Sequence, residues 1–345
     1  MSPSLVPNET TPSSLLRRTH MAQTIRHLAA VSLVTAAALL SACGGSSSDE
    51  ADAQETTPND TQAGSEGNSD PGASPDGTGE AAAEEATAAP SNPNAILRTT
   101  TSGKWSPNVN ETWQWQLTGS VDTAYNVAVY DIDLFDTPAS KIAAIRSAGS
   151  RVVCYFSAGS AENWRSDYGK FTSADKGNPL DGWAGERWVD TRSASVRSIM
   201  RSRLDLAKAK GCDGVEPDNV DAWDNNPGFN GALTKATQLD YNTFLANEAH
   251  ARGLLIGLKN DIDQVAALAG IFDFAVNEQC HQYNECGAYS AFTSRGKPVF
   301  NAEYRSAWVS DATARAQLCA RARAANIRTL VLPLSLNNSF RYSCD

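Results

Sequence analysis

The chain has 345 residues, 41% of them hydrophobic, eight Trp and a formal net charge of −10. This length allows one domain of roughly 200–250 residues with flanking segments, and it argues against two large domains. Eleven Asp and Glu and no Lys or Arg lie between Gly44 and Ala95, so the rest of the chain from Ile96 is near neutral. That balance excludes the gathered basic surface of a nucleic-acid-binding protein.

The first 43 residues have the pattern of an export signal. After Met21, the predicted true start, a basic Arg26 precedes an apolar run that ends in LSAC at residues 40–43. The run is too short and too rich in small residues to be a typical transmembrane helix. Its ending resembles the bacterial lipoprotein signal, and the alternative is an ordinary secretory signal that happens to contain Cys43. The resemblance implies a lipid anchor on Cys43, and Gly44 after it favours the outer membrane or cell surface.

Residues 44–96 are rich in Ser, Gly, Ala, Pro, Thr, Asp and Glu, and residues 44–95 contain no aromatic side chain. Such a segment cannot bury enough apolar surface to offset the entropy lost on ordering. We predict a disordered acidic linker here. An interaction tail is the alternative, although no hydrophobic anchor interrupts the segment.

The domain predicted for residues 97–345 alternates strands with helices. Eight β-rich runs are present: TWQWQLTG, NVAVYDIDLF, RVVCYFSAG, DGVEPDNV, LLIGLKND, FDFAVNEQ, PVFNAEY and RTLVLPLSL. Helical stretches separate several of them: TPASKIAAIRSAG, SVRSIMRSRLDLAKAKG, LDYNTFLANEAHARG and DATARAQLCARARAANI. This α/β alternation predicts a (β/α)8 TIM barrel. A doubly wound open sheet is the alternative, weakened by the absence of a G-x-G-x-x-G loop.

Six further cysteines would meet an oxidising environment in an exported protein. Cys280 and Cys286 flank a five-residue loop, and Cys319 and Cys344 could join the last helix to the C-terminal tail. For Cys154, a buried free thiol and a disulfide to Cys212 both remain open. No C-x-x-C pair occurs, so we predict no metal site.

Polar residues end several of the predicted strands. They are Asp131 and Asp133, Glu216 and Asp218, Lys259 and Asn260, Asn277 and Glu278, and Asn301 and Glu303. In a TIM barrel the carboxyl ends of the strands form the active face, so these side chains are expected at one mouth. Some of the acids could instead form structural ion pairs with Lys259. For Glu216, a role in the site and a structural role are equally weighted.

Two carboxylates beside aromatic side chains suit the hydrolysis of a glycosidic bond. Sugars stack on aromatic faces, and seven aromatic residues lie near strands or the loops after them: Trp113, Trp115, Tyr130, Tyr155, Trp223, Tyr283 and Tyr304. Core packing explains each of them singly. The aromatic residues therefore support a sugar-binding mouth without establishing it.

The motifs WQWQLTG, VYDIDLFDT, VVCYFSAGSAENWR, GCDGVEPDNVDAW, LLIGLKND, FAVNEQC and VFNAEY, taken together, resemble glycoside hydrolase family 114. The resemblance covers about residues 103–345, and the characterised activity of this family is endo-α-1,4-polygalactosaminidase. It implies Asp218 as the nucleophile after the fourth strand and Glu278 as the general acid and base after the sixth.

The resemblance also implies a polysaccharide substrate, without cofactor or metal, for a monomeric enzyme. Because a deacetylated galactosamine polymer is cationic, Asp131, Asp133 or Asp221 could hold its amines. The other expected substrate contacts are Trp115, Tyr155, Glu216, Asn219, Lys259, Asn260, Asn301 and Glu303. Two alternatives remain: a non-catalytic carbohydrate-binding surface lipoprotein, and a glycosidase for another α-linked galactose or amino-sugar polymer.

Overall fold

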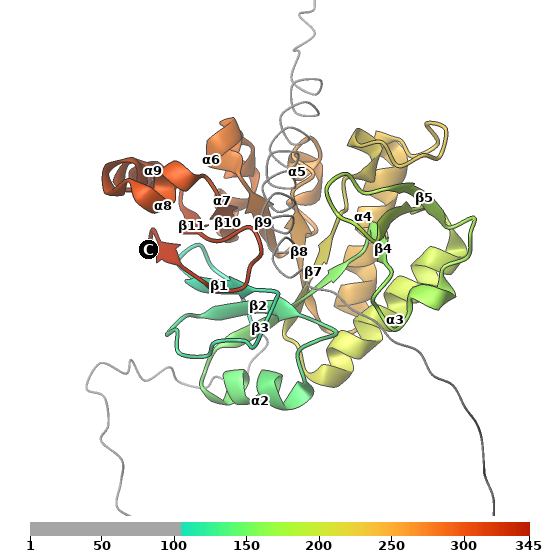
Figure 1. Cartoon of the computed structure of the whole chain (residues 1–345), viewed down its shortest axis with the longest axis horizontal. Helices are drawn as coiled ribbons and strands as arrows, with labels where there is room; N and C mark the ends of the chain where they lie inside the picture. The colour runs from blue at the N-terminus through green and yellow to red at the C-terminus, as the bar shows by residue number, and fades with distance from the viewer. Residues whose placement is uncertain (1–104) are drawn as a thin grey trace, which may run out of the picture. The chain divides into compact units, whose positions relative to one another are not determined.

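The computed structural model describes residues 105–345. Its main sheet is curled and contains eight parallel strands that neighbour one another in chain order (Figure 1). They are β1 (Trp113–Gln116), β2 (Val129–Asp133), β3 (Arg151–Ser157), β7 (Gly214–Asp218), β8 (Leu255–Lys259), β9 (Phe274–Glu278), β10 (Val299–Glu303) and β11 (Ile327–Val331). All eight predicted strands are confirmed. The doubly wound alternative is wrong, because that fold requires the strand order to reverse and here it does not.

Four short strands were not predicted. The strand β12 (Tyr342–Ser343) pairs antiparallel with β11 at the end of the sheet. The other three form a separate antiparallel sheet in the order β4-β6-β5, which we call the β4–β6 lobe (residues 160–189). Its strands are β4 (Ser160–Glu162), β5 (Lys176–Pro179) and β6 (Glu186–Val189). The lobe interrupts the chain between β3 and the helix that leads to β7.

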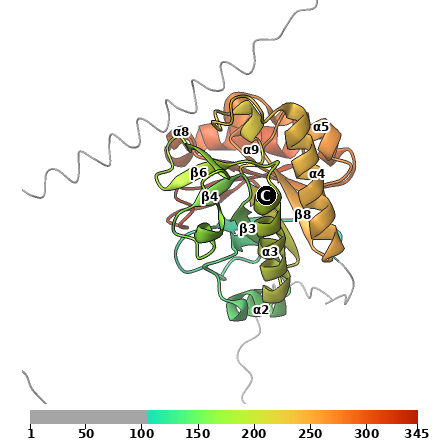
Figure 2. The same ribbon diagram turned by 90° about the vertical axis from the view of Figure 1, so that its right-hand side faces the viewer.

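The four predicted helices are present as α2 (Ala139–Ser147), α3 (Ala194–Lys210), α4 (Lys235–Ala251) and α9 (Ala312–Ala324). Side chains at both ends explain where α3 lies: Ser193 accepts a hydrogen bond from the Val196 amide, and Gly211 ends the helix at a φ of 89°. Figure 2 shows α3 and α4 side by side against the sheet. Shorter helices are α5 (Val265–Leu268), α6 (Cys280–Tyr283), α7 (Ser290–Thr293) and α8 (Ser306–Ser310), with 3₁₀ turns at Tyr168–Lys170, Ala222–Asp224 and Cys286–Tyr289.

The two faces of the sheet bury separate hydrophobic cores. The inner core contains Trp113, Val129, Val153, Leu255, Phe274, Phe300 and Leu330, one residue from each of seven parallel strands. The outer core joins the alternate residues of the strands, such as Ile132, Val152 and Ile256, to helix residues such as Ile199 and Leu245. Because side chains alternate along a strand, membership of one core fixes which polar neighbours point inward and which point toward the helices.

Three disulfides join the six cysteines of the described residues: Cys154–Cys212, Cys280–Cys286 and Cys319–Cys344. Both predicted pairs are confirmed, and the open question at Cys154 is settled in favour of a disulfide. Cys154–Cys212 ties β3 to the residues before β7, across a sequence separation of 58. The predicted signal, Cys43 and linker lie outside the described residues. Within residues 105–345, no helix is long and apolar enough to span a membrane.

Candidate active site

One lysine lies at the centre of a carboxylate cluster at the ends of β7, β8 and β9. The Nζ atom of Lys259 lies 2.9 Å from Asp218 Oδ1, 3.2 Å from Glu278 Oε2 and 3.4 Å from Glu216 Oε1. Its side chain is buried, and although burial opposes its charge, Asp218, Glu278 and Glu216 hold its pKa well above the usual value. We call these four residues the Lys259 cluster. The sequence predicted all four as residues of the mouth, and the structure brings them together.

Asp218 is held by donors on several sides. Tyr155 Oη donates to Asp218 Oδ2 at 3.0 Å, and the Asn219 amide donates to Asp218 Oδ1 at 2.7 Å. The Asn219 side chain turns away and donates to Ser157 Oγ at 2.9 Å, so this residue contributes its backbone to the site. At Gly159, a Cβ would lie 1.6 Å from the Asn219 carbonyl oxygen. Glycine is therefore required where the chain leaves β3 and passes Asp218.

Glu278 is partly exposed and is oriented from two sides. Tyr304 donates a short hydrogen bond from its hydroxyl to Glu278 Oε1. On the helix side of the sheet, Asn260 Oδ1 accepts the Glu278 amide at 3.0 Å. Asn260 was predicted to contact substrate, but its side-chain oxygen accepts the backbone amide of Glu278, the candidate acid. It therefore acts as a positioning residue in this structure.

An amide ladder on the helix side continues from Asn260 across the next strands. Asn277 Nδ2 donates to Asn260 Oδ1 at 3.2 Å, Asn301 Nδ2 donates to Asn277 Oδ1 at 2.9 Å, and Thr329 Oγ1 donates to Asn301 Oδ1 at 3.0 Å. The ladder consists of these four residues, Asn260, Asn277, Asn301 and Thr329. It fixes the end of β9, the strand that presents Glu278.

Asn301 and Glu303 therefore do not lie at the mouth, and the expectation that they contact substrate is corrected. Alternation places them on the same face as Val299, which packs in the outer core. Both side chains are fully buried, and Glu303 Oε1 accepts the backbone amide of His281 at 2.8 Å. Burial raises the pKa of Glu303 to about 8. The residue of this strand segment that reaches the site is Tyr304, one position further along.

The floor of the site is a buried acid pair below Lys259. Asp131 and Glu216 are both buried, and their carboxyl groups lie near enough for each to act on the pKa of the other. Two ionised carboxylates buried side by side repel each other, so burial favours a proton on at least one of them. Burial raises the pKa of Asp131 to about 7, against the lowering effects of Glu216 and Lys259. The pKa of Glu216 is raised well above its usual value by burial and by Asp131.

Trp115 and Asp133 were also predicted to contact substrate, but both contact other residues of the protein. Trp115 is buried in the inner core, with its ring centre 5.0 Å from Lys259 Nζ. Asp133 binds Arg165 through two hydrogen bonds, of 2.6 Å and 3.0 Å, and is 4% exposed. Since Arg165 belongs to the β4–β6 lobe, Asp133 joins that lobe to β2. It is not free to hold a substrate amine, which corrects that expectation.

Asp221 lies half-buried beyond Asp218, near enough for the two charges to interact. Burial, followed by the charge of Asp218, raises the pKa of Asp221 to about 7. A carboxyl group in this state would ionise readily beside an arriving cation. Among the acids predicted to hold an amine, Asp133 is paired with Arg165 and Asp131 is buried, so Asp221 is the half-buried one that has no ion pair among the described residues.

The sequence analysis missed Glu186 and gave no role to the serines Ser157 and Ser160. Ser157 Oγ and Ser160 Oγ lie 2.6 Å apart, and Ser160 Oγ donates to Glu186 Oε2 at 2.6 Å. Burial raises the pKa of Glu186 to about 7, and the charge of Asp218 adds to this. No local motif marks Glu186, because it reaches the site only through the fold of the β4–β6 lobe. Tyr304 was noted as an aromatic residue near the mouth, and it packs against the inner core that contains Phe300.

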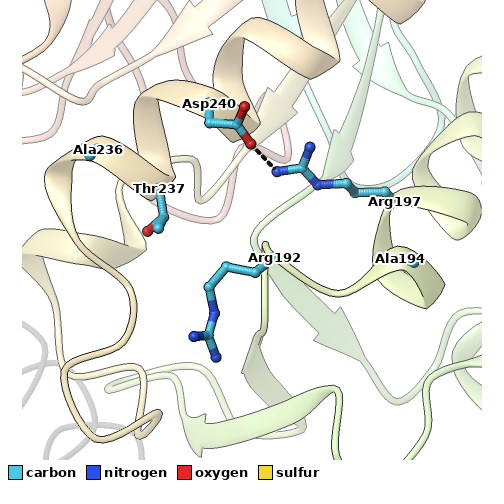
Figure 3. Close-up of a pocket in the computed structure, with 6 residues that line it drawn as sticks. All are labelled: Arg192, Ala194, Arg197, Ala236, Thr237 and Asp240. Atoms are coloured by element: carbon cyan, nitrogen blue, oxygen red, sulfur yellow. Dashed lines mark hydrogen bonds and ion pairs between the residues drawn. The ribbon is translucent and has the colours of Figure 1, made fainter.

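Two hollows lie apart from the Lys259 cluster. One, of about 460 Å³, lies between the N-terminal ends of α3 and α4 (Figure 3), and its lining comprises Arg192, Ala194, Arg197, Ala236, Thr237 and Asp240. Its two arginines are already paired, Arg192 with Asp190 and Arg197 with Asp240. A second, of about 520 Å³, is lined by Asn178, Trp223, Asn225, Asn226, Pro227, Gly228, Asn230, Gly231 and Leu233. Neither lining includes the carboxylate pair expected for glycoside hydrolysis.

One group of potential metal ligands occurs among residues 105–345: Cys280, His281 and Cys286. The two sulfurs are joined in a disulfide, so neither is available as a thiolate. Burial also lowers the pKa of His281 to about 4.

Comparison with known proteins decides the family. The model of glycoside-hydrolase family GH114 matches residues 94–345. The chain belongs to GH114. It is accordingly a glycoside hydrolase, and its Lys259 cluster occupies the carboxyl ends of the parallel strands, where this kind of fold presents its catalytic groups. A search of the curated proteins gave no match.

One solved structure of a similar protein supports the GH114 assignment, and a second supports the fold. The Ega3 protein of Aspergillus fumigatus, solved in complex with galactosamine, is 45% identical and has a TM-score of 0.66. That match covers 71% of this chain and 99% of the Ega3 chain. The glycoside hydrolase domain of PelA from Pseudomonas aeruginosa is 14% identical with a TM-score of 0.53, covering 66% of this chain and 96% of that domain. This second likeness supports the fold alone.

Proposed function

We propose that this GH114 protein is an endo-acting hydrolase of α-1,4-linked galactosamine polymer, with Asp218 as nucleophile and Glu278 as general acid and base. The proposal includes closure of the curled sheet into a (β/α)8 barrel. The Trp113 Nε1 atom on β1 donates to the Arg328 carbonyl on β11 at 2.9 Å, which supports closure. The galactosamine found with Ega3 supports the sugar, given the 45% identity.

The proposed mechanism depends on one observation: Asp218 and Glu278 both form ion pairs with the ammonium group of Lys259. Asp218 Oδ1 and Glu278 Oε2 lie 2.9 Å and 3.2 Å from Lys259 Nζ. These two oxygens can be no further apart than those distances combined, which is below the ~6.5 Å lower limit of inverting enzymes. This bound supports a retaining reaction, in which no water stands between the second carboxylate and the sugar.

The proposed reaction has two displacements. Asp218 Oδ attacks the anomeric carbon while the glycosidic C–O bond breaks, and Glu278 gives its proton to the leaving oxygen. Glu278 then takes a proton from water, whose oxygen attacks the anomeric carbon and breaks the ester bond to Asp218. The hydrogen bond from Tyr155 to Asp218 and that from Tyr304 to Glu278 keep both carboxyl groups oriented through these steps.

The charge of the site suits a cationic sugar. Glu216, Asp218 and Glu278 share the single ammonium of Lys259, so the mouth retains negative charge when all three acids are ionised. Asp221 is a further half-buried acid close enough for the charge of Asp218 to act on it, and no ion pair of the described residues engages it. We propose that it holds the ammonium of a galactosamine unit, and that Asp221→Asn raises KM most at low ionic strength.

The test is hydrolysis of α-1,4-linked galactosamine polymer by the full chain, with the products examined for size and anomeric configuration. Oligosaccharides of retained configuration are expected from the wild type. Asp218→Asn and Glu278→Gln should each lower kcat by about 10²–10⁴-fold or more. Asp240→Asn is the matched control, because Asp240 is an exposed acid on α4 paired with Arg197. Polymer binding without product would favour the carbohydrate-binding alternative, and inverted products would contradict the retaining mechanism.

The location in the cell envelope is also a proposal. It depends on Cys43 and the residues before it. The three disulfides of the described residues support export, because such bonds persist in oxidising compartments. Release of the protein into solution by Cys43→Ser, measured by cell fractionation, would support the lipid anchor.

A further inference from the structure

Two tryptophans on the β4–β6 lobe are exposed to solvent. Trp164 is 53% exposed and Trp183 is 48% exposed, whereas five of the six other tryptophans are buried and Trp223 is half-buried. Single exposed hydrophobic residues are common, but an indole is the largest apolar group a protein can present to water. Two of them on one small lobe indicate a binding surface.

The fold of the lobe brings the two tryptophans to the same turn. The Asn163 amide donates to the Gly185 carbonyl at 3.0 Å, and the Glu186 amide donates to the Trp183 carbonyl at 3.2 Å. A Cβ at Gly185 would lie 3.0 Å from Trp164 Cζ3, so the Trp164 ring lies along the turn that contains Trp183. Gly185 also has a φ of +95°, which favours glycine. The turn therefore leaves space for the Trp164 ring.

This turn is joined to the active site by a chain of hydrogen bonds. Glu186 follows Gly185 and accepts from Ser160, which contacts Ser157 at 2.6 Å. Ser157 in turn accepts from Asn219, the neighbour of Asp218, at 2.9 Å. The charge of Asp218 also acts on the pKa of Glu186, so the base of the lobe lies beside the candidate nucleophile.

A second connection comes from the other strand of the lobe. Arg165 follows Trp164 in the chain and binds Asp133 at the end of β2 and Glu162 at the end of β4. All three of these side chains are buried. The segment that carries Trp164 is therefore fixed to the rim of the curled sheet through Asp133 and to the rest of the lobe through Glu162.

We propose that Trp164 and Trp183 form a secondary subsite for the polysaccharide, holding sugars several units away from the bond that is cleaved. The inference rests on the proposed function, because it takes the polymer as the occupant. An indole face accepts the apolar face of a sugar ring, and it also attracts a cationic group such as the ammonium of galactosamine. The continuity of the lobe with the Lys259 cluster places this surface where a bound chain would extend.

The test compares the full chain with Trp164→Ala, Trp183→Ala and the double variant on galactosamine oligosaccharides of increasing length. In the wild type, kcat/KM should rise with length. Each alanine variant should lose about tenfold in kcat/KM on the polymer while remaining within about twofold on the shortest cleaved oligosaccharide. Trp164→Phe and Trp183→Phe keep an aromatic face and are the matched controls, expected to retain most of the gain with length.

Equal losses at every length would overturn the proposal, since they would indicate an effect on the active site or on folding. Unchanged kcat/KM on the polymer would also overturn it. Failure of the proposed function is seen separately, as absence of hydrolysis by the wild type at any length. In that event, polymer binding by Asp218→Asn decides: tryptophan-dependent binding that strengthens with length supports the subsite, and binding that ignores both tryptophans, or no binding, refutes it.

Discussion

Replacing Lys259 with Met should destabilise the protein strongly, because it removes the only ammonium group within 4.0 Å of three carboxylates in the described residues. The Nζ atom makes ion pairs of 2.9 Å, 3.2 Å and 3.4 Å, and its side chain is 2% exposed. Removing one partner from a buried ion pair typically costs about 3–5 kcal/mol. With a urea slope of about 2–3 kcal/mol per M, the unfolding midpoint should fall by roughly 1–2 M at pH 8.

The loss in Lys259→Met should depend on pH in a defined direction. The pKa of buried Glu216 is already raised, and Lys259 opposes that rise, so without the ammonium group the pKa of Glu216 in the folded state rises further. A group whose pKa is higher in the folded than in the unfolded state stabilises the protein at low pH and loses that effect as pH rises. The difference in unfolding free energy between wild type and variant should therefore be largest at pH 8 and narrow toward pH 5.

Urea unfolding at pH 5 and pH 8 measures this effect, with Lys297→Met as the matched control. Lys297 is a half-buried lysine whose Nζ donates to the backbone carbonyls of Ala269 and Phe272. Removing Lys297 leaves no buried carboxylate without its ion pair. The loss in unfolding free energy should therefore change little between the two pH values. A loss below about 1 kcal/mol in Lys259→Met, or an equal loss at both pH values, would refute the electrostatic account. The variant should also lose at least about 10²-fold in kcat, since Asp218 and Glu278, the two acids proposed for catalysis, lose their common partner.

Three further outcomes are expected. Gly159→Ala should lower the melting temperature and the activity, because its Cβ would lie 1.6 Å from a backbone oxygen, whereas Gly169→Ala meets no atom within 4 Å and should behave like wild type in thermal unfolding. The pKa of Asp131 is raised to about 7, so its stabilising effect is present at low pH and lost as pH rises toward 7; Asp131→Asn should flatten the pH dependence of unfolding between pH 5 and 8 by up to ~1.4 kcal/mol per pH unit. Replacing both cysteines of Cys154–Cys212 with Ser should lower the unfolding free energy by about 4 kcal/mol, as expected for a separation of 58 residues. Chemical denaturation measures this loss, and a much smaller loss would show that the disulfide does not restrain the unfolded chain.

The sequence predicted the Lys259 cluster because two regularities combined. Several strands change from apolar to polar at their carboxyl ends, and parallel strands in chain order bring those ends to one edge. Asp218, Lys259 and Glu278 were therefore predicted together although they lie far apart in the chain. The same reasoning predicted the eight strands and the four long helices.

Alternation could not show which face of β10 points inward. Phe300 and Tyr304 point inward, and Asn301 and Glu303 lie on the face of Val299 toward the helices, so the polar side chains of this strand lie away from the mouth. The role of Asn301 depends on Asn277 and Thr329 from neighbouring strands, which no local pattern reveals.

Long-range pairing also explains the error at Asp133. Its partner Arg165 lies in the β4–β6 lobe, which short strands of three or four residues build without a clear periodic signal. Glu186 was missed for the same reason.

The amide ladder behind β9 has a consequence for engineering this protein. A designer seeking greater heat resistance would ordinarily replace buried polar residues between a sheet and its helices with larger apolar ones. Here the ladder begins at Asn260, whose oxygen also accepts the amide of Glu278. An apolar residue at Asn260 or Asn277 would remove hydrogen bonds that fix the backbone of Glu278. Better packing between the sheet and its helices would therefore lower the activity of the site on the inner face.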